Sequence, residues 1–176
     1  MKAAAGFLLL EVLVALTLTA LGIAAWMQGQ ASALQQSRIS AHRTMALMLA
    51  TELAETLRAS PAQAPAMTHA GPFAGVLPAP PAACQPSTCD ALAWAQADLL
   101  QWRDRVRQSL PSGSSQLSVD PLARSARISV GWHEPAGWAH TAQTPAYLRC
   151  PDAWAAPAPA PSSAPAVRCL LMEVAW

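Results

Sequence analysis

The feature that most constrains this chain is an apolar run close to its N-terminus. Residues 7–27, FLLLEVLVALTLTALGIAAWM, contain a single charged side chain, Glu11. As a helix, these 21 residues would extend about 31 Å, which matches the hydrocarbon core of a bilayer. Lys2 precedes the run and the next basic residue is Arg38, so we expect a cytoplasmic N-terminus. The remainder of the chain is then expected outside the cytoplasm.

A cleaved secretory signal peptide is the alternative explanation of the same run. Ala31, Ser32 and Ala33 form a small-residue cleavage pattern shortly after it. Glu11 argues against this explanation, because a carboxylate costs roughly 2.5–3.5 kcal/mol at the centre of a bilayer and less near its edge. A signal peptide has no need of such a charge, so we expect Glu11 to be functional.

The residues around Glu11 resemble the N-terminal signal of type IV prepilins. The motif is Gly6-Phe7 followed by an apolar stretch, with glutamate as the fifth residue after the Gly-Phe junction. The resemblance implies that prepilin peptidase cleaves after Gly6 and N-methylates Phe7, which makes residues 1–6 a leader peptide. The apolar helix would then stay in the inner membrane as an anchor and later join the filament core. Glu11 is implied to be the assembly residue, whose charge pairs with the N-terminal amine of a neighbouring pilin.

Hydrophobic periodicity extends the predicted helix beyond the membrane. A helical face of small and large apolar residues repeats at the expected spacing, and Pro61 closes the run. This face comprises Ala46, Leu49, Ala50, Leu53, Ala54 and Leu57. We therefore expect one helix from residue 7 to about 59, with a transmembrane half over 7–27 and an amphipathic half over 28–59. The amphipathic half is expected to pack on a globular head formed by residues 60–176.

The head is predicted to contain a second helix and an antiparallel sheet. Asp90 is placed to cap a helix that ends before Gly113. After Gly113 the hydrophobic period changes to two, which predicts a hairpin over 117–132 and a further strand over 170–176. The expected fold class is α+β.

Two proline-rich segments of the head are predicted to be loops. Residues 61–86 contain seven prolines, which exclude a regular helix or a central strand there. Residues 155–165, AAPAPAPSSAP, form a low-complexity run that we expect to be mobile and exposed.

The sequence lacks the motifs of common enzymes and metal sites. With 12% charged residues and a net charge of +1, it has no basic surface of the kind that binds nucleic acid. No hydrolase motif, P-loop or H-E-x-x-H accompanies its four histidines. Cys84 and Cys89 are separated by four residues, and no second ligand pair lies at zinc-finger spacing. We therefore expect no enzymatic activity, no cofactor and no metal.

The middle of the chain is similar to PilV-type minor pilins, the family called type IV pilus modification protein. The matching residues are Cys84, Cys89-Asp90, Asp98-Leu99 with Trp102, Leu110-Pro111-Ser112-Gly113, and Ile128-Ser129-Val130-Gly131-Trp132. The resemblance implies a pilin inserted in low copy or at the tip, which takes part in priming type IV pilus assembly and hence in twitching motility. Its implied partners are other minor pilins, the major pilin, the inner-membrane assembly platform and a tip adhesin. Residues 134–166 depart from this pattern.

The four cysteines are predicted to form two disulfides in the periplasmic head. An even count outside the cytoplasm is typical of disulfide-bonded domains, and four cysteines allow three pairings. Sequence proximity and the resemblance to pilin C-terminal loops favour Cys84 with Cys89 and Cys150 with Cys169.

Two other functions are compatible with the same features. A pseudopilin of a type II secretion system uses the same N-terminal signal for a short filament in protein export. A membrane-anchored binding module would have no role in a filament. Gene neighbourhood would distinguish a pseudopilin from a pilus subunit. The effect of deleting the protein on twitching motility and on secretion would distinguish the pilus subunit, the pseudopilin and the binding module.

Overall fold

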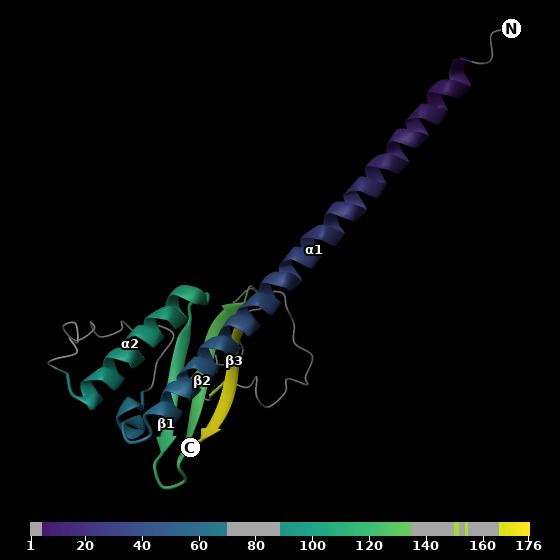
Figure 1. Ribbon diagram of the computed structural model, residues 1–176. Coiled ribbons are helices and arrows are strands. Elements are labelled where there is room, and N and C mark those ends of the chain that lie inside the picture. The colour runs from purple at the N-terminus through teal and green to yellow at the C-terminus, as the bar shows by residue number, and fades with distance from the viewer. Residues whose placement is uncertain (1–4, 70–88, 135–149, 152–153, 155–165) are drawn as a thin grey trace. The chain divides into compact units, whose positions relative to one another are not determined.

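The computed structural model describes residues 5–69, 89–134, 150–151, 154 and 166–176. It divides into two compact units, Met1–Ala41 and His42–Trp176, which are described separately. Helix α1 (Ala5–Ala59) begins in the first unit and ends in the second. The predicted helix over 7–59 is confirmed, as is the predicted α+β fold class (Figure 1).

The first unit contains the apolar part of α1. Its large side chains, such as Leu9 and Trp26, are exposed to 74% and 67%, so they have no protein core to pack against. The hydroxyls of Thr17 and Thr19 donate to backbone carbonyls of their own helix at 2.8 Å, which satisfies them without water. By length and hydropathy this helix could cross a membrane, a property that it shares with N-terminal signal sequences.

The core of the second unit lies between two helices and a sheet. The apolar face of α1 predicted over residues 46–57 is buried, and α2 (Ala91–Ser109) packs alongside it. Asp90 begins α2 as expected, because its Oδ1 accepts a hydrogen bond from the backbone N–H of Ala93 at 2.7 Å. The side chains that α2 buries are Ala95, Leu99, Trp102 and Val106.

The sheet has three antiparallel strands in the order β1-β2-β3 (Figure 1). Strands β1 (Ser114–Asp120) and β2 (Ser125–Glu134) form the predicted hairpin, and β3 (Ala166–Ala175) is the predicted C-terminal strand. Asp120 stabilises the hairpin turn, since its Oδ1 accepts hydrogen bonds from two backbone N–H groups, both at 2.9 Å.

The prediction of an unbroken loop from residue 61 is wrong at its start. A 3₁₀ helix, η1 (Ala64–Met67), forms there and tolerates Pro65 because a proline near a helix start loses no hydrogen bond. Met67 is fully buried, and His69 exchanges two backbone hydrogen bonds with Leu117 at 3.0 and 2.9 Å. The rest of that predicted loop and the low-complexity run over 155–165 lie outside the described residues.

Candidate functional site

The predicted processing and assembly residues lie at the start of α1. Gly6 and Phe7 are in its first turn, and Glu11 follows one turn after Phe7, about 6 Å along the axis. Glu11 is exposed and has exposed apolar neighbours in Leu10 and Val12. Over residues 9–27 the helix therefore presents one charged side chain, the carboxylate of Glu11, on a mainly apolar surface. Cleavage after Gly6 and methylation of Phe7 stay predictions.

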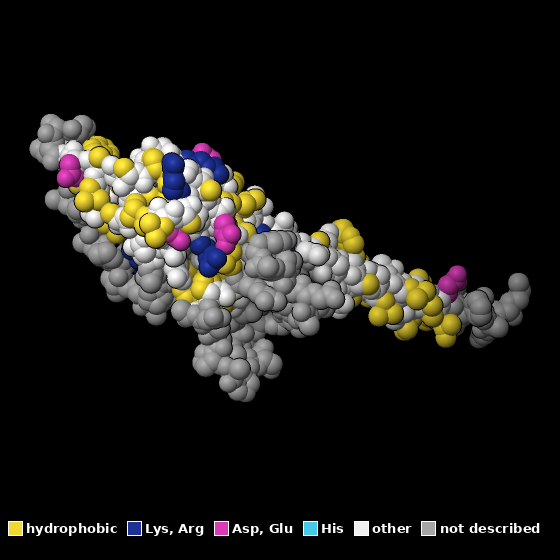
Figure 2. All heavy atoms as spheres, turned by 90° about the horizontal axis from the view of Figure 1, so that it is seen from below, with side chains coloured by type: hydrophobic (Ala, Val, Ile, Leu, Met, Phe, Trp, Pro, Cys, Tyr) yellow, Lys and Arg dark blue, Asp and Glu magenta, His cyan; other side chains and the backbone are white. Residues whose placement is uncertain are grey.

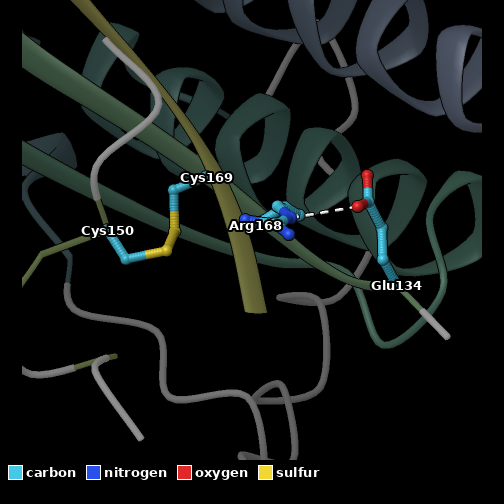
Figure 3. The surroundings of a disulfide bond; sticks show 4 residues. All are labelled: Glu134, Cys150, Arg168 and Cys169. Carbon is cyan, nitrogen blue, oxygen red and sulfur yellow. Dashed lines mark hydrogen bonds and ion pairs between the residues drawn. A yellow bond between two sulfur atoms is a disulfide. The ribbon is translucent and has the colours of Figure 1, made fainter. Parts of the chain in front are cut away.

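Each cysteine of the head that the structure describes is disulfide-bonded. Cys150 and Cys169 form one bond, with their Cα atoms 5.0 Å apart (Figure 3). Cys169 lies in β3 and is fully buried, so the bond attaches the chain at residue 150 to the sheet. Cys89 is also in a disulfide, and its predicted partner Cys84 lies outside the described residues.

A buried ion pair joins β2 to β3 near this disulfide (Figure 3). The Nε of Arg168 donates to Oε2 of Glu134 at 3.0 Å, and the indole Nε1 of Trp132 donates to the other oxygen at 3.3 Å. Glu134 is 1% exposed, and burial lowers the pKa of Arg168 although its hydrogen bond with Glu134 opposes that shift. Because removing either partner would leave a buried charge, the pair constrains how the two strands meet.

Sequence reasoning assigned neither Glu134 nor Arg168 a partner. Strand periodicity could have revealed the pair. Side chains at every second position of β2 face the core, and Glu134 follows Ile128, Val130 and Trp132 at this spacing. Arg168 likewise continues the core-facing series of Leu170 and Val174 in the neighbouring strand. Opposite charges at core-facing positions of adjacent strands indicate a buried pair.

His69 is a second polar contact that sequence reasoning missed. Its Nδ1 lies 3.2 Å from the carbonyl of Met67 and its Nε2 lies 3.1 Å from the hydroxyl of Ser115. Because a carbonyl can only accept, Nδ1 carries the proton and Nε2 accepts from Ser115. Burial lowers the pKa of His69 to about 4, against the opposing effect of its hydrogen bond with Met67 and with a smaller contribution from the positive charge of Arg103. Ser115 is buried, so this pair fastens η1 to β1 and does not present a nucleophile to a substrate.

The three arginines of α2 are not equivalent. Arg105 forms an ion pair with Glu52 of α1, while Arg103 is partly buried, which lowers its pKa together with the nearby charge of Arg107. One helix turn from Arg105, the Nε1 of Trp102 donates to the carbonyl of Leu49 at 2.8 Å. These contacts join α1 and α2 along a seam inside the second unit.

Within the described ranges, no group of three or more His, Cys, Asp and Glu side chains is arranged to hold a metal ion. A search against family models, curated proteins and solved structures finds no match to this chain.

Proposed function

We propose that this chain is a minor pilin that primes assembly of the type IV pilus and is incorporated in low copy or at the tip. The observation that supports this function most strongly is the exposed carboxylate of Glu11, which lies one turn after Phe7 and is the one charged side chain of the membrane-length apolar stretch over residues 9–27. The same helix continues into a small disulfide-bonded α+β head. An anchor with no role in assembly would not require the charge.

The proposed role of Glu11 follows from the cost of a charge in apolar surroundings. A carboxylate in the bilayer core or between packed apolar helices is stable only when a cation neutralises it. Prepilin peptidase would generate such a cation by cutting after Gly6, because each mature subunit then begins with the amine of its first residue. Pairing Glu11 with the amine of a neighbouring subunit removes two charges from the apolar phase and fixes the axial register between the two helices.

The head has the features expected of a domain that works outside the cytoplasm. Its core is small, and the bond between Cys150 and Cys169 closes a ring with a sequence separation of 19 residues. In the chain-entropy model a ring of this size stabilises the folded head by about 3 kcal/mol. This bond would form in the periplasm, where disulfides persist, with the head presented to the other minor pilins and the assembly platform.

A charge-removing substitution tests the proposal directly. Glu11→Gln keeps the size of the side chain, so cleavage and membrane insertion should persist while incorporation into sheared pili falls sharply. Glu55→Gln is the matched control, because Glu55 is on the same helix but forms only an exposed pair with Arg58, worth little energy. Glu11→Gln appearing in filaments at the wild-type level would refute the charge-pairing role.

Two further measurements separate the alternatives. Mass spectrometry of the mature protein should find N-methylated Phe7 as its first residue, whereas a start at Leu34 would indicate ordinary signal peptidase and no anchor. Deletion of the protein should abolish twitching motility and leave protein secretion intact. The opposite phenotype would assign it to a type II secretion system.

A further inference from the structure

Strand β3 forms one edge of the sheet, and hydrogen bonds at the other edge show which of its backbone groups face outward (Figure 1). Leu117 of β1 exchanges both backbone hydrogen bonds with His69, at 3.0 and 2.9 Å, so its N–H and C=O point away from β2. In an antiparallel pair, opposite residues either bond to each other or both point away. Ile128, which is opposite Leu117, therefore directs its polar groups toward Met172 of β3.

The same alternation continues along β3. Met172 and every second residue from it bond to β2, so the residues between them point their N–H and C=O groups out of the sheet. The backbone N–H of Trp176 donates to the carbonyl of Arg124 at 3.1 Å, which places Trp176 in the inward series and agrees with this phase. The outward series is Val167, Cys169, Leu171, Glu173 and Ala175.

The outward groups of β3 form a template for another strand. None of them has a backbone hydrogen bond to a residue that the structure describes. Proteins commonly protect such an edge with a proline, a bulge or a charged side chain. β3 has no proline and pairs with β2 without a bulge, and the charge of Glu173 is neutralised by Arg127 at 2.8 Å.

The edge selects its partner by backbone geometry and apolar contact rather than by charge. An extended chain presents N–H and C=O groups at the spacing of a strand, which a helix or a small molecule does not. On the core face of β3, Leu170 and Met172 pack against the core and are still partly exposed. Figure 2 shows charges of both signs interspersed with apolar side chains on one face of the head, so no single-sign field favours a charged partner.

We propose that β3 receives an extended segment of a partner protein, which adds a fourth strand to the sheet. Segment residues opposite Leu170 and Met172 are apolar and extend the core, and those opposite Glu173 and Ala175 are polar. A second copy of this chain does not fit, because two identical edge strands pair about a twofold axis that reverses one head relative to the other. Copies held in one membrane by α1 have the same orientation. This exclusion of a second copy is the one step that rests on the proposed function.

Amide exchange tests whether the edge is free. Hydrogen–deuterium exchange of the full-length chain in neutral detergent micelles is followed residue by residue in ¹H–¹⁵N spectra. The amides of Leu171 and Glu173 should exchange at least tenfold faster than those of Leu170 and Met172, which bond to β2. Equally slow exchange of all four amides would mean that the edge is already paired and would overturn the proposal.

A peptide with one blocked edge tests strand addition. The probe is acetyl-Thr-Val-Thr-Val-Thr-Val-Thr-amide with N-methylated valines, so that its threonine N–H groups alone can pair with β3. In that pairing the valines lie on the core face beside Leu170 and Met172. At saturation the probe should slow the exchange of the Leu171 and Glu173 amides at least tenfold.

The control peptide has the same sequence with N-methylated threonines and free valine amides. It retains only the edge that would turn its valines away from the core face of β3. It therefore loses the contacts with Leu170 and Met172 and should bind at least tenfold more weakly than the probe.

Two substitutions of Leu171 test the same edge from the protein side. Leu171→Pro removes an outward N–H that makes no bond in the sheet, and edge strands tolerate proline at such positions. It should bind the probe at least fivefold more weakly than Leu171→Ala, which shortens the side chain and keeps the N–H. Circular dichroism establishes that both variants are folded, and the two peptides decide the question on the wild type if Leu171→Pro is not.

Four further results would each overturn the proposal. The probe leaves the exchange of the outward amides unchanged, the control peptide binds as tightly as the probe, or folded Leu171→Pro binds like Leu171→Ala. The fourth is a dimer in sedimentation equilibrium that Leu171→Pro disrupts, which would assign the edge to a second copy. None of these measurements involves Glu11, so failure here and failure of the proposed function are separate results.

Discussion

Acid should destabilise the head through His69. In the folded state the imidazole is neutral and lies between the carbonyl of Met67 and the hydroxyl of Ser115, with its ring edge-on to Trp102 at 6.4 Å. Burial holds its pKa at about 4, and the charge of Arg103 acts in the same direction. On unfolding, the imidazole returns to water and to its ordinary pKa of 6.5.

The sign and size of the effect follow from this difference in pKa. Between pH 6.5 and pH 4 the unfolded state binds a proton at His69 that the folded state does not bind, so stability falls as the pH falls through this window. Above pH 6.5 both states are neutral and the contribution of this group is constant. At about 1.4 kcal/mol per pH unit, the loss by pH 4 is about 3 kcal/mol.

The assay compares the wild type with His69→Gln, because the carboxylates titrate equally in both proteins and cancel in the difference. Urea unfolding of the full chain in neutral detergent is followed by near-ultraviolet circular dichroism at pH 7, 5.5 and 4. At pH 7 the wild type should be more stable by about 1–2 kcal/mol, owing to its ring contact and hydrogen bonds.

That advantage should disappear and reverse as the pH approaches 4, a change of about 3 kcal/mol between the two proteins. The ring signals of His69 should titrate near pH 4 in nuclear magnetic resonance spectra. Parallel stability curves for the two proteins, or a midpoint near 6.5 for His69, would refute the reasoning.

Three other substitutions should lower the free energy of unfolding, measured in urea at pH 7. Glu134→Ala leaves the guanidinium of Arg168 without its buried carboxylate and should cost about 3–5 kcal/mol, most of which the double variant Glu134→Leu/Arg168→Met should restore. Asp90→Ala removes the cap of α2 and should cost about 1 kcal/mol, with the helix content by circular dichroism nearly unchanged. Gly113→Ala places a Cβ atom 2.2 Å from the carbonyl oxygen of Val106, so a loss of about 1–3 kcal/mol is expected, whereas Gly29→Ala should be neutral or stabilising.

The parts of the fold that the sequence predicted are those with local signals. The end of α1 before Pro61, the start of α2 at Asp90 and the period-two hairpin each depend on residues within a few positions of one another. η1 had no such signal, because its Ala- and Pro-rich composition is that of a loop. What orders it is distant in sequence, namely the burial of Met67 and the hydrogen bond from Ser115 to His69 across 46 residues.

The contrast between local signals and contacts distant in sequence also applies to the candidate sites. Glu11 could be found from sequence because its motif occupies six consecutive residues from Gly6, and its function stays a prediction that filament assays must test. The seam between α1 and α2 could not be found, because it depends on two helices meeting across 53 residues, as Trp102 and Leu49 do. Periodicity places each helix face toward a core but does not say which faces meet.

The ion pair and the disulfide of β3 both depend on the strand register. In the native register Trp132 is opposite Arg168 and Gly131 is opposite Cys169. A slip of one residue would turn Arg168 away from the face that bears Glu134 and turn Cys169 into the core, because successive side chains point to opposite faces of a sheet. Glu134 is opposite Ala166 in the native register, so the ion pair already spans an offset of two residues, about 7 Å along the strands. A slip of two would keep the faces and would either double this offset or bring Arg168 directly opposite Glu134, depending on its direction. The apolar face of β3, with Leu170, Met172 and Val174 at equal spacing, would tolerate both slips, and the ion pair opposes only the one that lengthens its offset. The bond between Cys150 and Cys169 then holds β3 in the native register once it has formed.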